Sequence, residues 1–385
     1  MMPTDDPKLR LAVIANGDPL DVNLWSGTPL HMVEALRPLV DFVHIEPEPW
    51  APWFTLLRRA AMKFSGGKLD IIWSRTLTRL GSSASRGRVV KAAPDATLVI
   101  SNSALGRLLG HQTRTINLAD TTGPSILNYY PEINRLSTRI KQRIVSFSKD
   151  NVSAAFLNSY PSFWARDSAI EDIGVPAERA VQIAWGANFK QFPQGSARQL
   201  SSPARLLFVG IDWLRKGGPQ VVEAVRLLRE KGVAVQLDVV GYRPETETAS
   251  DGVTYHGRLY KNRTDHLALL ESLYQQAHLF VLPTLYECLG IVFCEAAAYG
   301  LPSVSLRTGG VPSVVKDGET GLLLDVTASP ADLADAIAGL IGDAPRYEAM
   351  SRAVLADSHE RLNWDAWSHS MIATIRQRLA ATGKA

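Results

Sequence analysis

The feature that most constrains the fold is an alternation of short β-branched runs with helical stretches, which continues along the whole 385-residue chain. Such alternation is typical of βαβ units, in which a helix connects two parallel strands. Residues 187–204, which are rich in Gly, Pro, Ser and Gln, interrupt it. This segment lacks an apolar period and is typical of a linker. The sequence therefore predicts two α/β domains, each a doubly wound Rossmann-like sheet.

The candidate strands fall into one series on each side of this linker. The first series is 9–15, 41–45, 69–73, 97–101, 115–119, 154–158 and 181–185, and the second is 205–209, 233–240, 253–256, 278–282 and 303–306. We expect an N-terminal domain over 1–187 and a C-terminal domain over 188–364. A last helix in 365–385 can cross back to the N-terminal domain. Two domains also fit the length, because single cores stop growing at about 250–300 residues.

Positive charge is concentrated in one part of the chain. Residues 51–150 contain 16 Lys and Arg but 5 Asp and Glu, whereas the whole chain carries a net charge of +3. Such a block suggests an anionic partner, namely a membrane surface, a phosphorylated acceptor or nucleic acid, and a solvated basic face is the alternative. Residues 53–64 combine Trp, Phe and Leu with Arg58, Arg59 and Lys63. They predict peripheral contact with an anionic membrane, with a core helix as the rival interpretation.

Several function classes find no support in the composition. No run of 18 apolar residues is present, and the N-terminus opens with acids, so we expect neither a membrane span nor a secretory signal. Cys288 and Cys294 lack the spacing and histidine companions of a zinc site and are too few for a disulfide framework. We therefore expect a cytoplasmic protein, with the inner face of the membrane as a further site, that uses no metal and no bound cofactor.

The most informative segment is 278–302, where a buried strand leads through a loop into a helix. Glu287 and Glu295 lie eight residues apart and are predicted to contact opposite ends of an extended ligand. Between them, the N–H groups of Leu289, Gly290 and Ile291 at the helix start predict an anion site for a diphosphate. We expect Glu287 to bind sugar hydroxyls and Glu295 to bind ribose hydroxyls. The alternative for either glutamate is a helix cap or a solvated acid.

The run from Glu287 to Glu295, ECLGIVFCE, resembles the E(x7)E signature of family-four retaining glycosyltransferases. Three further segments resemble that family: 208–218 its phosphate-binding loop, 239–244 its second glycine loop, and 306–323 its GG-x-P-E element. The resemblance covers the C-terminal domain and continues more loosely through 158–188 and 25–36. It implies donor contacts at Gly27, Gly210 and Gly241.

The resemblance also implies a fold and a reaction. The fold is GT-B, in which two Rossmann-like domains face each other across a cleft, the acceptor binding the first domain and the nucleotide-sugar donor the second. The reaction is transfer with retention, in which the leaving phosphate takes the acceptor's proton. Arg215 and Lys216 would stabilise the departing diphosphate. Asp120 is the best N-terminal candidate for a sugar contact, although an Asp that caps the next turn fits equally well.

Three positions depart from the family pattern. Ile211 stands where the family has a phosphate-binding Arg, Ser313 where it has Glu, and Cys288 where it has Gly. We predict that Arg215 replaces the missing Arg and that Ser313 affects only structure. A nucleotide-sugar epimerase and a non-catalytic nucleotide-sugar-binding protein remain alternatives, and nucleic-acid binding is disfavoured. The sequence does not determine the nucleotide, the sugar or the acceptor.

Overall fold

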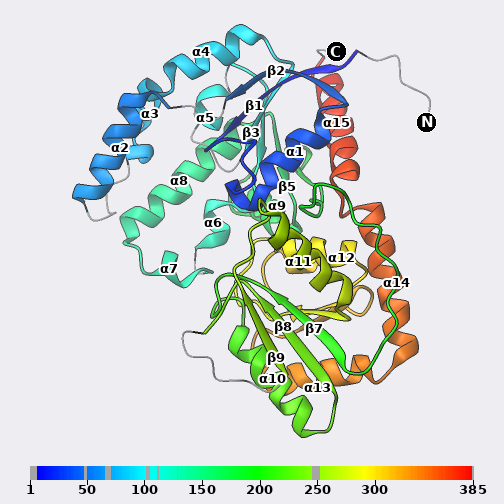
Figure 1. Ribbon diagram of the computed structural model, residues 1–385. Coiled ribbons are helices and arrows are strands. Elements are labelled where there is room, and N and C mark those ends of the chain that lie inside the picture. The colour runs from blue at the N-terminus through cyan, green and yellow to red at the C-terminus, as the bar shows by residue number, and fades with distance from the viewer. Residues whose placement is uncertain are drawn as a thin grey trace. The chain divides into compact units, whose positions relative to one another are not determined.

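The computed structural model describes residues 7–46, 50–65, 71–100, 105–110, 112–127, 129–244 and 252–383. The chain forms two compact units, the first comprising residues 1–183 and 368–385 and the second residues 184–367. Each unit is built on one six-stranded sheet, shown with its helices in Figure 1. Two doubly wound α/β units were predicted, and the two sheets confirm that fold class.

The first unit has the strand order β2-β1-β3-β4-β5-β6, and its strand pairs are parallel. Its strands are β1 (Leu9–Ala15), β2 (Val40–Glu46), β3 (Ala96–Ile100), β4 (Thr115–Leu118), β5 (Leu157–Tyr160) and β6 (Ala180–Gln182). Its helices are η1 (Leu24–Gly27), α1 (Thr28–Leu36), α2 (Pro52–Phe64), η2 (Ile71–Trp73), α3 (Arg75–Gly81), α4 (Ser83–Ala92), α5 (Gly106–Leu109), α6 (Gly123–Ile126), α7 (Pro131–Asn134), α8 (Thr138–Ala154), α9 (Phe163–Glu171) and η3 (Ala177–Arg179).

The second unit has the order β12-β11-β10-β7-β8-β9, and its pairs are also parallel. Its strands are β7 (Ala204–Val209), β8 (Val235–Val240), β9 (Val253–Gly257), β10 (Leu279–Leu282), β11 (Ser303–Leu306) and β12 (Gly321–Leu324). Its helices are α10 (Gly218–Glu230), α11 (Thr264–Gln276), α12 (Ile291–Ala298), η4 (Val311–Ser313), α13 (Pro330–Ile341) and α14 (Ala344–Glu360). Helix α15 (Trp364–Ala381) begins in this unit and ends in the first.

The strand orders locate one switch point in each sheet. In the first unit the chain passes from β1 to β2 on one side and then to β3 on the other, so the order reverses between β1 and β3. In the second unit the same reversal falls between β7 and β10. Doubly wound sheets bind ligands beyond the carboxyl ends of their strands at this point. The loops after β1, β7 and β10 are therefore where ligand contacts are expected.

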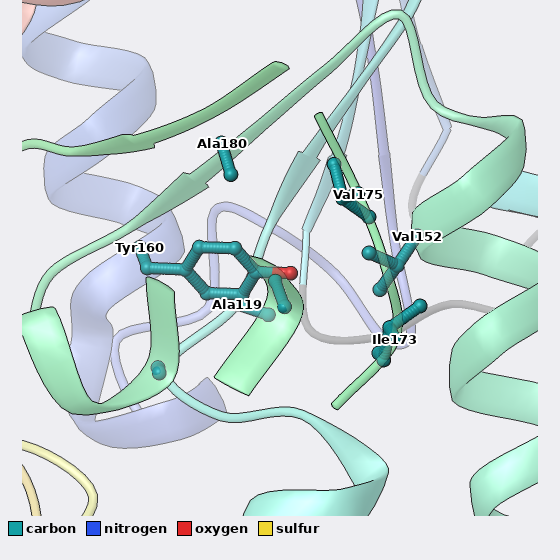
Figure 2. Packing of buried hydrophobic residues seen from close by; sticks show 8 residues of the cluster. Ala119, Val152, Tyr160, Ile173, Val175 and Ala180 are labelled. Atoms are coloured by element: carbon teal, nitrogen blue, oxygen red, sulfur yellow. The ribbon is translucent and has the colours of Figure 1, made fainter. Parts of the chain in front are cut away.

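Buried side chains fix the helices of the first unit to its sheet. Figure 2 shows part of this core, in which fully buried Tyr160 from β5 packs with Ala119, Val152 and Ile173. Half-buried Trp164 from α9 packs against the same cluster. Burying a large aromatic side chain contributes about 1.5–3 kcal/mol. This packing holds α8 and α9 beside the end of β4, where Asp120 follows.

One predicted strand is wrong and one strand was missed. Within the predicted strand 69–73, residues 71–73 form the 3-10 helix η2, and residues 69 and 70 lie outside the described ranges. A short apolar run fits a strand or a buried turn equally well by its pattern. Here the chain turns into α3, whose N-cap Ser74 accepts a hydrogen bond from the Leu77 N–H at 3.3 Å. The missed strand, β12, has only four residues and pairs with β11 at the sheet edge.

Two further predictions concern residues outside the described ranges. The first six residues belong to the acidic N-terminus, and Ser101 is the last residue of the predicted strand 97–101. The strand predicted at 154–158 begins three residues late, at Leu157, because Ala154 is still the last residue of α8.

Candidate functional site

The switch point of the second unit brings together three predicted residues. Lys216, in the loop after β7, forms an ion pair with Glu287, in the loop after β10. The Arg215 Nη1 lies 3.7 Å from the same Glu287 Oε2. The side chains of Lys216 and Glu287 are only 11% and 12% exposed. Two cations thus converge on one carboxylate that is largely shielded from water.

Backbone contacts hold this arrangement in place. The Arg215 Nη1 donates to the Tyr286 carbonyl at 2.6 Å, and its Nε donates to Asp212 at 3.0 Å. The Leu285 N–H donates to the Arg215 carbonyl at 2.9 Å, so the loops after β7 and β10 are joined directly. Ile211, at the place of the family's Arg, is 62% exposed. The guanidinium that does lie at this switch point is that of Arg215.

Glycine at position 290 shapes the predicted anion site. Helix α12 begins at Ile291, and its N-cap Gly290 has the left-handed φ of 81°. A Cβ there would lie 2.6 Å from the Phe293 ring, so a side chain is excluded twice, by φ and by contact. Leu289, Gly290 and Ile291 stand at the positive end of the α12 dipole, where orphan N–H groups attract anions. Their contact with a diphosphate stays a prediction.

The other predicted donor-binding glycines have a structural reason of their own. The Gly210 N–H donates to the Val240 carbonyl, and the Gly241 N–H donates to the Gly257 carbonyl, at 2.9 and 2.8 Å. Gly241 has a φ of 101°, and a Cβ there would collide with the Gly210 carbonyl. These glycines let two strand ends approach closely, and their N–H groups are already used between strands.

In the first unit, the predicted donor contact Gly27 lies at the start of α1. It is the N-cap of this helix, with a φ of 84°, and Thr28 is the first helical residue. Asp18 lies in the loop after β1, and its Oδ1 accepts a hydrogen bond from the Leu20 N–H at 2.9 Å, so this side chain caps the turn. Asp120 is half-buried and follows β4 by two residues. Its contact with a sugar stays a prediction.

Glu295 occupies a buried network that the sequence did not predict. Its side chain is 2% exposed, and its Oε1 pairs with Lys261 while its Oε2 accepts from the Tyr274 hydroxyl at 3.2 Å. Burial and the Glu295 carboxylate raise the pKa of Tyr274, so its phenol stays protonated and donates. A carboxylate offers about four lone-pair positions, and these two contacts leave acceptor capacity for ribose hydroxyls.

Lys261 also reaches the segment that begins the second unit. Its Nζ donates to the Asn188 carbonyl at 3.0 Å and lies 5.1 Å from the centre of the Phe189 ring. Phe189 in turn meets the Tyr274 ring edge-on, with ring centres 5.9 Å apart. No local pattern could have found Lys261, because its partner Glu295 is 34 residues away. A lysine in a loop after a strand end was the only signal.

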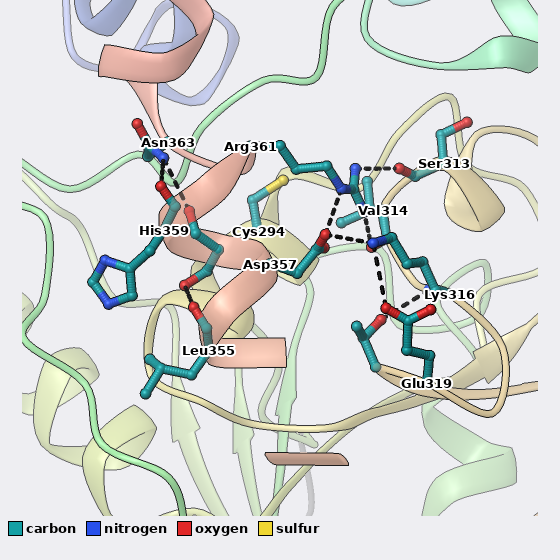
Figure 3. Close-up of polar contacts among 12 residues, drawn as sticks. Cys294, Ser313, Val314, Lys316, Glu319, Leu355, Asp357, His359, Arg361 and Asn363 are labelled. Carbon is teal, nitrogen blue, oxygen red and sulfur yellow. Dashed lines mark hydrogen bonds and ion pairs between the residues drawn. The ribbon is translucent and has the colours of Figure 1, made fainter. Parts of the chain in front are cut away.

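Ser313, which stands where the family has Glu, contacts Arg361 through its backbone carbonyl. Figure 3 shows Arg361 donating to the carbonyls of Ser313, at 2.8 Å, and Val314, at 3.1 Å, while its Nε donates to buried Asp357 at 2.7 Å. The same Asp357 pairs with Lys316 at 2.8 Å, and this hydrogen bond raises the pKa of Lys316. The loop around η4 is thereby tied to α14 through backbone carbonyls, which any residue at position 313 would supply.

The first unit contains a cavity of about 460 Å³ at the carboxyl end of β1. Its lining residues come from the loop after β1, from α2 and from Trp50, which lies two residues before α2: Asn16, Gly17, Trp50, Phe54, Thr55, Arg58, Arg59 and Met62. Trp50 stacks on Phe54, with ring centres 4.7 Å apart, and packs against a core cluster that includes Ala12 and Ile14 of β1. The cavity therefore lies against the sheet, and two arginines are among the residues that line it.

Helix α2 carries a second, different face, which we call the apolar stripe. The stripe consists of Trp53, Leu56, Leu57 and Phe64. Leu56 and Phe64 are 65% and 88% exposed. At about 100° per residue, Arg58 lies on the opposite side of the helix from the stripe, whereas Arg59 follows Leu56 by three residues and lies beside it. Both arginines line the cavity. An interfacial helix carries its basic residues on the polar face, so the predicted contact of residues 53–64 with an anionic membrane stays a prediction.

Three further observations concern possible metal ligands, membrane-spanning helices and cysteines among the described residues. No group of three or more His, Cys, Asp or Glu that could hold a metal occurs in the described parts of the chain. No helix there is long and apolar enough to cross a membrane. Neither cysteine forms a disulfide bond, and burial raises the pKa of the Cys294 thiol to about 12.

The two doubly wound units, each with one switch point in its sheet, define the fold class of the protein. Solved structures with the same fold support it. Sucrose-phosphate synthase from Thermosynechococcus elongatus matches 97% of this chain and 100% of its own, with a TM-score of 0.65 and 18% identity. HepE of Anabaena, solved with UDP and glucose, matches 96% and 100%, with a TM-score of 0.63 and 16% identity. The chain has the GT-B fold.

The sequence comparisons name the family. Residues 203–343 match the family described as glycosyl transferases group 1, so the second unit carries a domain of that family. A glycogen synthase of Mycobacterium tuberculosis is 30% identical over 223 residues, 56% of this chain and 52% of that protein. A D-inositol 3-phosphate glycosyltransferase of Corynebacterium aurimucosum is 29% identical over 216 residues, 51% of each. The match spans about half the length of these curated relatives, and it confirms the resemblance of the second unit to glycosyl transferases group 1.

Proposed function

We propose that the protein is a retaining glycosyltransferase that moves a sugar from a nucleotide-diphosphate-sugar to an acceptor hydroxyl. The observation that carries the proposal is the convergence of Lys216 and Arg215 on Glu287 at the β7/β10 switch point. A departing diphosphate needs fixed positive charge, and a bound sugar needs a carboxylate acceptor. Both lie here beside the start of α12, in a domain of the glycosyl transferases group 1 family.

In the proposed reaction the bond between the donor's anomeric carbon and its phosphate oxygen breaks. The acceptor's hydroxyl oxygen forms the new bond to that carbon on the same face, and its proton passes to the leaving phosphate. Lys216, Arg215 and the N–H groups at the start of α12 stabilise the diphosphate charge as it develops. No general base from the protein is required by this balance.

The test is a turnover screen over uridine, guanosine and adenosine diphosphate sugars, beginning with UDP-glucose because HepE was solved with UDP. Slow donor hydrolysis that releases the sugar with retained configuration supports the proposal. Conversion of the donor sugar to an epimer would identify an epimerase instead. Nucleotide-sugar binding with no turnover, even when candidate acceptors are added, would identify a binding protein.

The two glutamates are expected to fail differently. Glu295→Gln should weaken UDP binding about tenfold, because hydrogen bonds to a charged acceptor contribute about 1.5–3 kcal/mol. Glu287→Gln should lower kcat while UDP affinity stays near that of the unmodified protein, since its proposed partner is the sugar. Calorimetric titration with UDP and steady-state kinetics separate the two roles. Equal loss of UDP affinity in both variants would contradict the assignment of Glu287 to the sugar.

We also propose that the protein works at the cytoplasmic face of a membrane, which the apolar stripe of α2 contacts. A Leu56→Ser/Phe64→Ser variant should lose binding to vesicles at least about tenfold, since each buried apolar side chain contributes about 1.5–3 kcal/mol. Flotation with phosphatidylcholine vesicles that contain phosphatidylglycerol measures this. An Arg58→Glu/Arg59→Glu variant should also float less, because these arginines attract the anionic headgroups. Flotation that is insensitive to this charge reversal would favour a core helix with a basic outer face.

A further inference from the structure

We propose that Trp213 and Tyr242 are positioning residues: their stacked rings hold the loop after β7 in the conformation that a bound diphosphate requires. This is the loop that brings Arg215 and Lys216 to Glu287. Trp213 lies in this loop and Tyr242 in the loop after β8, and their ring centres are 4.3 Å apart with planes that differ by 7°. The diphosphate in this inference rests on the proposed transferase function, whereas the holding of the loop rests on contacts within the second unit.

The indole of Trp213 is packed by several neighbouring elements of the second unit. It meets the Phe208 ring of β7 edge-on, with ring centres 5.3 Å apart, and the Tyr255 ring of β9 at 6.2 Å. A Cβ at Gly218, the first residue of α10, would lie 2.1 Å from the indole atom Cε3, so the indole rests on the helix backbone. Together with the ring of Tyr242, these contacts fix the indole to two strands, a helix and a second loop.

The indole and the two cations belong to one short turn. The Gly218 N–H donates to the Trp213 carbonyl at 2.9 Å, so the backbone is joined across the turn. The Lys216 N–H donates to the Asp212 carbonyl, also at 2.9 Å. Only four residues lie between Trp213 and Gly218, and Arg215 is one of them. A displacement of the indole would therefore displace both cations.

The other apolar side chains of this turn do not anchor it. Ile211 and Leu214, on either side of Trp213 in the sequence, are 62% and 71% exposed. When the cations of the turn serve a diphosphate, they share their contact with Glu287, so the turn needs an anchor that the ligand does not replace. Fixed charges stabilise a leaving group best when they need not rearrange during the reaction. The aromatic stack supplies such an anchor.

Gly241 explains why Tyr242 lies over the turn. Gly241 has a φ of 101°, and a Cβ there would lie 2.3 Å from the Gly210 carbonyl oxygen. The chain after β8 thus passes directly against the chain after β7, and Tyr242 is the next residue. Tyr242 is half-buried, so replacing its ring changes the contact between the two loops more than the core.

The first measurement is amide hydrogen exchange on the full-length protein without ligand. In Tyr242→Leu, which removes the flat ring, the segment 211–218 should exchange at least about tenfold faster, because its N–H groups lose their fixed acceptors. Gly218→Ala should have the same effect with both rings present, since its Cβ enters the space of the indole. Tyr242→Phe retains the stack and should exchange as the unmodified protein does. So should Gly339→Ala, whose Cβ meets no atom within 4 Å.

The second measurement is calorimetric titration with inorganic pyrophosphate, which carries the diphosphate charge without a base. Tyr242→Leu and Gly218→Ala should weaken this binding at least about tenfold, as expected when the binding conformation is populated about a tenth of the time. Tyr242→Phe and Gly339→Ala should stay within about twofold of the unmodified protein. With UDP-glucose as donor, kcat/KM should fall in the first two variants and in neither control.

Two outcomes would overturn this proposal alone. One is a Tyr242→Leu variant with a lower free energy of unfolding in urea but full pyrophosphate affinity, because Tyr242 would then serve only the fold. The other is an equal loss of affinity in Tyr242→Phe, because the stacked ring would then not be the cause. The expected losses of pyrophosphate binding, in a protein that transfers no sugar, would support the proposal and count against the transferase function. Absence of pyrophosphate binding by the unmodified protein would overturn both.

Discussion

Replacing Lys216 by alanine is expected to lower kcat/KM at least about a hundredfold. Lys216 pairs with Glu287, and both side chains are nearly buried, so water compensates poorly for the lost cation. A charge-assisted hydrogen bond contributes about 1.5–3 kcal/mol, and Lys216 makes such contacts both to Glu287 and, in the proposed reaction, to the leaving diphosphate. Steady-state kinetics on purified protein measure the effect. Lys231→Ala removes a lysine that is 54% exposed in a surface pair and should leave the rate unchanged.

Arg215 gives the companion measurement. If it replaces the Arg that Ile211 displaces, Arg215→Ala should lower kcat/KM about ten- to a hundredfold. The structure places its guanidinium 3.7 Å from Glu287 Oε2, although Asp212 also engages it. An Arg215→Ala variant with full activity, next to an inactive Lys216→Ala variant, would show that Arg215 serves only to hold the Tyr286 carbonyl.

Lys261→Met is expected to affect both stability and donor recognition. Removing one partner of a buried ion pair costs about 3–5 kcal/mol, and about 3 kcal/mol is expected here because Lys261 is itself 23% exposed. The free energy of unfolding from urea titration measures this loss. The charge of Glu295 would then lie buried with only the Tyr274 hydroxyl beside it. Lys261→Arg should recover part of both effects, and Lys231→Met is the surface control.

A comparison of UDP with its 2′-deoxy form separates recognition from stability. The unmodified protein should prefer UDP about tenfold if Glu295 accepts a ribose hydroxyl. In Lys261→Met that preference should disappear, because Glu295 is no longer held in position. A variant that is less stable but keeps the full preference for ribose would show that Lys261 only stabilises the fold.

Local pattern was sufficient for most of the fold, as β1 and β8 show. The predicted strand 9–15 has the same bounds as β1, and the predicted strand 233–240 ends with β8 and begins two residues before it. Both predicted strands are longer than the run at 69–73, so their pattern is less ambiguous. The run at 69–73 failed because a short apolar segment satisfies either a strand or a buried turn, and only packing decides between them.

The site divides along the same line. The sequence by itself predicted Glu287, Lys216 and Gly290 as site residues, because a glycine at a helix start and charged residues after strands can be recognised from local pattern. Only the tertiary structure decided that Lys261 pairs with Glu295 and that Arg58 and Arg59 line a cavity. The reason is physical: which residues meet across a sheet depends on strand order, and which side of a helix meets solvent depends on what packs against it. Neither quantity is contained in any short window of the sequence.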